Sequence, residues 1–117
     1  MAAVATRRIR PWLPVVLWAG VIFAFSSIPS LDTGLGVWDL VLRKIAHAAV
    51  YAVFALLILR AVDRVVPAFL GAVAYAATDE FHQSFVRGRQ GTLRDWAIDA
   101  AGAAVGLIAV SVLQRRR

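Results

Sequence analysis

Residues 45–62, IAHAAVYAVFALLILRAV, decide the fold that this sequence predicts. The stretch carries a single charged side chain, that of Arg60, close to its end. A helix that crosses the hydrocarbon core of a bilayer needs about 20 mostly apolar residues. The stretch is slightly shorter than that, but its apolar character predicts a membrane-spanning helix.

Three further apolar segments flank this one along the chain. They cover about residues 12–28, 66–85 and 96–113, and each is somewhat short or polar at one end. Together the four segments predict an all-α membrane protein. We expect a bundle of four transmembrane helices that forms a single domain over residues 1–117.

The composition supports the same class of protein. Hydrophobic residues make up 61% of the chain and charged residues 17%, whereas a soluble domain has about 45–50% apolar and about 25% charged residues. A short soluble domain leaves much of its surface exposed and has no core large enough for so many apolar side chains. Cysteine is absent, which excludes disulfides and thiolate metal sites.

The first segment has an alternative interpretation as a secretory signal peptide, because arginines precede an apolar stretch. No small-x-small cleavage pattern follows it, and Pro29 stands where cleavage would be expected. We therefore interpret residues 12–28 as a span that ends near Ser26-Ser27-Ile28-Pro29, since the residue before a proline disfavours helical geometry.

The arginines predict the orientation of the bundle. They gather before the first segment (residues 7–10), between the second and third (residues 60–64) and after the fourth (residues 115–117). Cytoplasmic loops carry the excess of lysine and arginine. We therefore expect both termini in the cytoplasm, and residues 26–42 and 86–94 on the outer side.

Polar and charged side chains gather at the predicted outer ends of the segments. A charge at the centre of a span costs about 2.5–3.5 kcal/mol on insertion scales, so such a cluster is a candidate functional site. Within each segment, spacings of three or four residues place these side chains on one helix face. They are Lys44, His47 and Tyr51 in the second segment, Asp79, Glu80, His82 and Gln83 in the third, and Asp95 and Asp99 in the fourth.

The predicted outer loop between the third and fourth segments reads Arg87-Gly88-Arg89-Gln90-Gly91-Thr92. Its glycines permit tight turns and a close approach of the backbone to a ligand. Arg87 and Arg89 are suited to binding phosphate or carboxylate groups in a bidentate manner. The fourth segment also carries Gly102 and Gly106, a small-xxx-small spacing that predicts close helix packing.

Several of these motifs together resemble the signature of the VanZ-like family. The matching residues are Trp18, Phe23 and Ser26-Ser27-Ile28-Pro29, then Lys44, His47 and Tyr51, then residues 79–85, Arg87-Gly88-Arg89, Asp95, Asp99, Gly102 and Gly106. The resemblance implies a small multi-pass protein of the bacterial plasma membrane. It also implies an association with low-level teicoplanin resistance, without a settled biochemical activity.

Three functions remain open for the polar cluster. In the first, the protein binds or remodels an anionic envelope lipid, a cell-wall precursor or a glycopeptide. In the second, it is a membrane-embedded hydrolase or transferase that acts on a lipid-linked phosphate at the outer leaflet, with candidate hydroxyls at Ser26, Ser27, Ser84 and Thr92. In the third, His47, His82 and carboxylates bind a metal, although no His-Glu-x-x-His motif is present. A purely structural network of ion pairs is the alternative to all three.

The predictions for individual residues follow these functions. The candidate catalytic residues are His47, Asp79, Glu80, His82, Asp95 and Asp99, and the candidate ligand-binding residues are Lys44, Tyr51, Gln83, Arg87 and Arg89. The metal hypothesis ranks last, so we expect no metal and no cofactor. The expected partners are the bilayer and an anionic ligand, with no nucleic acid.

Overall fold

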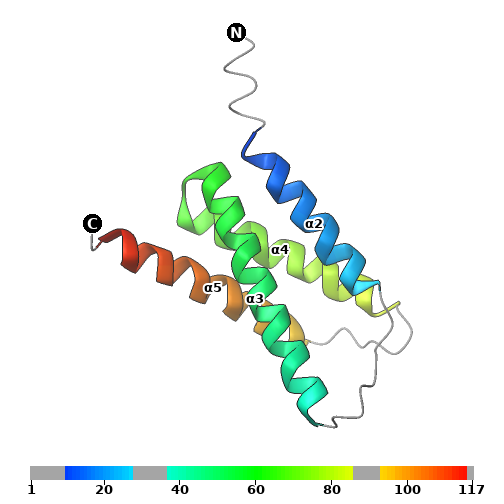
Figure 1. The fold of residues 1–117 in the computed structure, drawn as a ribbon. Helices are drawn as coiled ribbons and strands as arrows, with labels where there is room; N and C mark the ends of the chain where they lie inside the picture. The colour runs from blue at the N-terminus through cyan, green and yellow to red at the C-terminus, as the bar shows by residue number, and fades with distance from the viewer. Residues whose placement is uncertain (1–9, 28–36, 86–92, 116–117) are drawn as a thin grey trace.

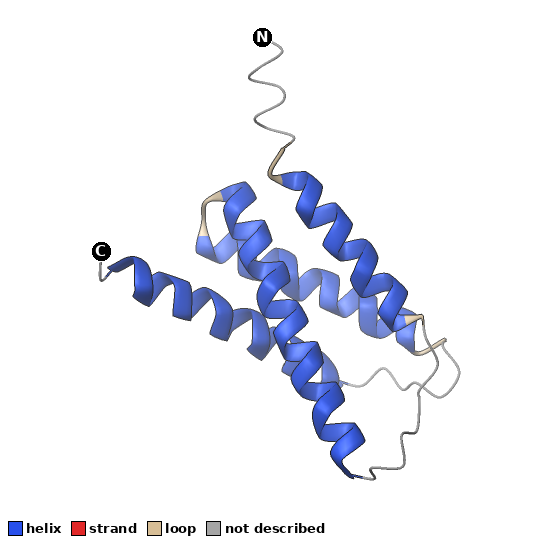
Figure 2. Ribbon diagram, in the orientation of Figure 1, coloured by secondary structure: helices blue, strands red, loops and turns tan. Residues whose placement is uncertain are grey.

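The structure is a computed structural model that describes residues 10–27, 37–85 and 93–115. Over these residues it is all-helical, as predicted, and contains no strand (Figure 1, Figure 2). The helices are α2 (Trp12–Ser26), α3 (Val37–Val62), α4 (Val65–Gln83) and α5 (Leu93–Arg115).

The helices match the four predicted segments, with the largest difference at the start of α3. This helix begins at Val37, whereas the apolar pattern predicts a start at residue 45. Arg43 and Lys44 come just before the apolar stretch, but the helix already includes them, because charged side chains do not interrupt helical hydrogen bonding. The extra turns place Lys44 inside α3, where its side chain reaches α5.

Two of the described helices are long and apolar enough to cross a membrane. The stretches are Val41–Val62 in α3 and Leu93–Gln114 in α5, each of 22 residues. With 15 residues, α2 is apolar but shorter than the roughly 20 residues that a full span needs. The arrangement with four spans and two cytoplasmic termini therefore stays a prediction.

The centre of the bundle is α3, which packs against each of the other three helices. In Figure 1 the connection from α3 to α4 lies at the same end of the bundle as the start of α2 and the end of α5. The core joins side chains of all four helices. Its buried apolar members are Val15 and Ile22 of α2, Tyr51, Phe54, Ala55 and Ile58 of α3, Ala68, Ala72 and Ala76 of α4, and Ala103 and Leu107 of α5.

Small residues bring α3 and α5 into close contact. A Cβ atom added at Gly102 would lie 2.7 Å from the Cα of Ala48, and one at Gly106 would lie 3.0 Å from the Cβ of Ala52. A side chain at Gly102 would overlap the backbone of Ala48, and one at Gly106 would fit only if Ala52 moved slightly. The predicted packing role of the two glycines is thus confirmed, and it holds the polar faces of α3 and α5 against each other.

Hydrogen bonds from large side chains to backbone carbonyls tie the other helices together. The bonds run from Trp18 Nε1 to Val50 O (3.0 Å), from Tyr75 OH to Ala19 O (2.6 Å) and from Trp96 Nε1 to Val73 O (3.1 Å). They connect α2 to α3, α4 to α2 and α5 to α4. Each bond fixes the offset of one helix along its neighbour.

The outward-facing surface of the bundle is largely apolar. Large hydrophobic side chains are exposed on every helix, among them Leu17 on α2, Ile45 on α3, Leu70 on α4 and Ile108 on α5. An apolar surface of this extent is costly in water and typical of contact with lipid or with another protein. The polar groups described next lie between the helices instead.

Candidate functional site

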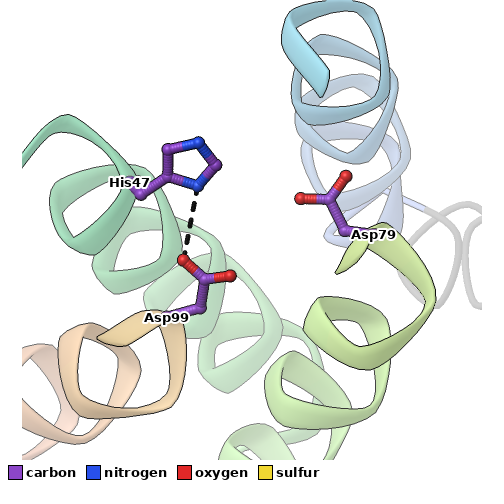
Figure 3. A group of neighbouring side chains, drawn as sticks. All are labelled: His47, Asp79 and Asp99. Carbon is purple, nitrogen blue, oxygen red and sulfur yellow. Dashed lines mark ion pairs between the residues drawn. The ribbon is translucent and has the colours of Figure 1, made fainter. Parts of the chain in front are cut away.

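Three helices each contribute one side chain to the centre of the candidate site. Figure 3 shows His47 of α3, Asp79 of α4 and Asp99 of α5 facing one another across the space between the helices. One potential ligand atom from each residue lies within 4.8 Å of the other two. The sequence spacing alone predicts the faces on which these residues lie, and the packing of α3 against α5 brings them together.

His47 and Asp99 form an ion pair within this group. Asp99 Oδ1 lies 3.4 Å from Nδ1 of His47, and only 1% of the Asp99 residue surface is exposed. The distance is that of an ion pair, but no donor in the described part of the chain makes a hydrogen bond to either oxygen of Asp99. A buried carboxylate in this state is costly unless a positive charge or a proton compensates it.

Asp79 is held in a chain of buried polar side chains. Its Oδ2 accepts hydrogen bonds from the hydroxyl of Tyr51 (2.9 Å) and from Nε2 of Gln83 (3.3 Å). Gln83 Nε2 also donates to Oγ of Ser26 at 3.2 Å, which links the chain to α2. All four residues are buried, so this network fixes the position of the Asp79 carboxylate.

Glu80 adds a further buried carboxylate beside the group. Only 7% of its residue surface is exposed, and neither carboxylate oxygen accepts a hydrogen bond from a donor in residues 10–27, 37–85 or 93–115. The electrostatic neighbours of Glu80 include Asp79, Asp95 and Asp99. The interior of the site is therefore strongly acidic.

An ion pair between Lys44 and Asp95 lies at the more exposed edge of the site. Lys44 Nζ is 2.6 Å from Asp95 Oδ1, and each side chain is 29% exposed. Both residues are predicted members of the cluster, one for ligand binding and one for catalysis. In this ion pair the positive charge of Lys44 and the negative charge of Asp95 offset each other next to the buried carboxylates.

His82 faces α2, although the sequence groups it with Asp79 and Gln83. Its ring stacks on Phe23 with centroids 4.4 Å apart, and its Nε2 lies 2.9 Å from Oγ of Ser27. Ser27 Oγ also lies 2.8 Å from the carbonyl oxygen of Phe23. A serine hydroxyl has one proton, so when that proton is donated to Phe23, His82 must be the donor to Ser27.

Arg87 and Arg89 lie outside the described residues. The structure therefore brings together the predicted residues of α3, α4 and α5 without testing the predicted contribution of this arginine pair. The residues gathered at the site are Lys44, His47, Tyr51, Asp79, Glu80, Gln83, Asp95 and Asp99.

A pocket between α2 and α3 adjoins the polar group, and sequence reasoning did not anticipate it. It is lined by Ile22, Phe25, Ser26, Ala46, His47, Val50 and Tyr51, with a lining surface that is almost entirely apolar. Three of these residues, Ser26, His47 and Tyr51, also belong to the polar contacts described above. The only feature of the sequence that points to this pocket is the Ser26-Ser27 pair, which is equally consistent with the end of a helix.

A model of the family described as VanZ/LLP1 matches residues 11–114 of the chain. No curated protein and no solved structure matches the chain.

Proposed function

Because the chain belongs to the VanZ/LLP1 family, we propose that it binds an amphipathic molecule of the cell envelope at the outer face of the plasma membrane. The polar headgroup of this molecule contacts the polar group between α3, α4 and α5. Its apolar chain occupies the pocket between α2 and α3. The chemistry shared by the candidate ligands is an acyl or polyprenyl chain that carries an anionic head.

The observation that carries this proposal is the junction of the apolar pocket with the polar group. Ile22, Ala46 and Val50 provide an apolar wall, and the same pocket is lined by His47 and Tyr51. A ligand that is apolar along its length and polar at one end fits such a junction, because each part meets matching chemistry. A purely polar solute would leave the apolar wall unused.

The membrane setting supports the same class of ligand. The family match and the two long apolar helices indicate a membrane protein. The arginines at residues 7–10, 60–64 and 115–117 favour a multi-pass arrangement with both termini in the cytoplasm. The polar group then lies near the outer leaflet, where lipids and lipid-linked wall precursors are present.

Cations for an anionic headgroup come from two parts of the chain. Lys44 is partly exposed at the edge of the site, and Arg87 and Arg89 follow α4 in the sequence. Arginine binds phosphate through two parallel hydrogen bonds. The ligands that meet these requirements are an anionic phospholipid, a lipid-linked wall precursor and a lipoglycopeptide such as teicoplanin. The last of these links the proposal to glycopeptide resistance.

A second candidate function, hydrolysis or transfer of a lipid-linked phosphate, is favoured by the pair of His47 and Asp99. A carboxylate beside Nδ1 holds an imidazole in the orientation that leaves Nε2 for proton transfer. In hydrolysis, His47 would take a proton from the water that attacks phosphorus and return it to the leaving oxygen of the lipid.

Native mass spectrometry of the purified protein tests both functions. The protein is incubated separately with phosphatidylglycerol, a polyprenyl-diphosphate wall precursor and teicoplanin. Filling the pocket by Ala46→Phe is expected to weaken binding of the true ligand by at least about tenfold, or 1.4 kcal/mol. The matched control is Ala49→Phe, which makes the same change at an exposed position of α3 outside the pocket.

The three ligands and the masses of the products separate the outcomes. Binding of one ligand that is lost in Ala46→Phe and kept in Ala49→Phe supports recognition of that ligand. A product of new mass that requires His47 supports the enzyme instead. Equal, weak association of all three ligands with the wild-type protein and both variants contradicts the proposed site.

A further inference from the structure

Two of the buried carboxylates of the site have no hydrogen-bond donor among the described residues that would compensate for their loss of hydration. Among the described residues, no donor group makes a hydrogen bond to the four buried carboxylate oxygens of Asp99 and Glu80. Ionised carboxylates in such surroundings are normally paired, protonated or bound to a metal ion. His47 lies at ion-pair distance from Asp99 and supplies at most one positive charge for the two buried carboxylates, which leaves them short of positive charge among the described residues.

The donor atoms next to Asp99 fit a metal ion in kind and in spacing. One atom each of His47, Asp79 and Asp99 lies within 4.8 Å of the others. Bonds of about 2.1 Å to nitrogen and oxygen place tetrahedral ligands about 3.4 Å apart. The group therefore needs to contract by roughly an ångström, which side-chain rotation of His47 and the two aspartates supplies.

The surroundings of Asp79 orient its carboxylate for this purpose. Tyr51 and Gln83 both donate to Oδ2, and Figure 3 shows the carboxylate facing His47 and Asp99. Hydrogen bonds of this kind hold metal ligands in place in known metal sites. Glu80, buried and with Asp99 among its electrostatic neighbours, adds negative charge that favours a cation here.

We propose that His47, Asp79 and Asp99 bind a single divalent cation of the Zn²⁺ or Mn²⁺ type. One imidazole with carboxylates suits these ions better than the soft, thiolate-binding ones. The nearest ammonium group, that of Lys44, is 2.6 Å from Asp95, which reduces its repulsion of a cation.

A bound cation would also explain how an acidic site accepts an anionic headgroup. The cation would bridge the buried carboxylates and a phosphate oxygen of the ligand, as divalent ions do in phosphate sites. This bridging role rests on the proposed function. Binding of the cation itself does not, so the two are tested separately.

The test measures metal content and affinity in the absence of any added lipid. The full chain is purified in detergent, stripped with a chelator, and dialysed against Zn²⁺, Mn²⁺, Mg²⁺ or Ca²⁺ before elemental analysis. We expect one equivalent of Zn²⁺ or Mn²⁺ in the wild-type protein. Asp99→Asn and His47→Gln should each lower the affinity at least about tenfold.

Two control variants define the site. Asp63→Asn removes an exposed acid between α3 and α4, away from the site, and His82→Gln removes the histidine that faces α2. Both should keep one equivalent of metal. Electron paramagnetic resonance of bound Mn²⁺ gives a second readout, because coupling to a histidine nitrogen should vanish in His47→Gln and persist in His82→Gln.

Asp99→Asn also separates a loss of metal binding from a loss of folding. Replacing this buried carboxylate by its isosteric amide should leave the stripped protein folded, which circular dichroism verifies. Metal that fails to bind the folded wild-type protein at millimolar concentration overturns the proposal. Metal that binds equally to all four variants also overturns it. In either case, lipid binding that depends on residue 46 would still support the proposed function.

Discussion

Oδ1 of Asp99 on α5 lies 3.4 Å from Nδ1 of His47 on α3, in a position where Asp99 is almost completely buried. The two residues are 52 positions apart in the sequence. Each is placed by the contact of Gly102 and Gly106 with Ala48 and Ala52. The chemistry of the site and the packing of the bundle therefore depend on the same pair of helices.

Replacing Asp99 by asparagine should separate stability from function. The amide keeps the shape of the side chain and removes a buried charge to which no described residue donates a hydrogen bond. We expect the metal-free variant to be at least as stable as the wild type, by up to about 2 kcal/mol, and to lose ligand binding. Denaturation in increasing dodecyl sulfate measures the first quantity. A variant destabilised by several kcal/mol without metal would show that ionised Asp99 holds the helices together.

Gly102→Ala should destabilise the bundle, although alanine favours helices. Its Cβ would lie 2.7 Å from the Cα of Ala48, so α3 and α5 must separate. Overpacking of this kind costs about 1–3 kcal/mol.

Gly71→Ala is the matched control in α4, because its nearest contact would be an ordinary 3.6 Å to Ile58. There we expect a gain of about 0.5–1 kcal/mol from helix propensity. The difference in unfolding free energy between the two variants measures the contact. Equal effects in both variants would contradict the close approach of α3 and α5.

Tyr51→Phe should weaken the site through Asp79. The change removes the buried hydroxyl that donates to Asp79 Oδ2 at 2.9 Å and keeps the ring that packs on Phe54. Gln83 is then the remaining described donor to the Asp79 carboxylate. The loss of the hydroxyl should cost about 1–3 kcal/mol of stability.

Tyr75→Phe removes a comparable hydroxyl outside the site, one that donates to the Ala19 carbonyl. It should lower stability but keep ligand and metal binding, whereas Tyr51→Phe should lower both. Calorimetric titration of both variants distinguishes them. Unchanged binding in Tyr51→Phe would mean that Asp79 needs no orientation by that hydroxyl.

The sequence predicts the helices and the composition of the site better than it predicts the contacts. Apolar segments identify all four helices, and spacing identifies the faces that carry Lys44, His47 and Asp99. The choice of partners depends on the rotation and offset of the helices, which no single segment encodes. Lys44 pairs with Asp95 and Tyr51 with Asp79 across intervals of 51 and 28 residues.

His82 illustrates the limit of spacing arguments. It lies three residues from Asp79 and belongs to the same region of α4, yet its ring stacks on Phe23 of α2. The position of α2 decides this contact, and the hydrogen bonds of Trp18 and Tyr75 fix that position. Neither bond has a signature in the sequence, so the part that α2 plays beside the site could not be predicted.

Ser27→Ala tests whether the contact between Ser27 and His82 is catalytic. The two side chains are 2.9 Å apart, as in a nucleophile and its base. However, the hydroxyl of Ser27 is also 2.8 Å from the carbonyl oxygen of its own helix at Phe23, and it has one proton to donate. Donation to Phe23 leaves His82 as a donor, which is the wrong role for a base.

We therefore expect Ser27→Ala to keep ligand binding and any product formation within about twofold, and to lower stability by about 1 kcal/mol. His47→Gln serves as the comparison, because it removes the histidine next to buried Asp99. Product masses measured in both variants decide between the two histidines. A product that disappears in Ser27→Ala but persists in His47→Gln would move the chemistry from the α3–α5 contact to the contact between α2 and α4.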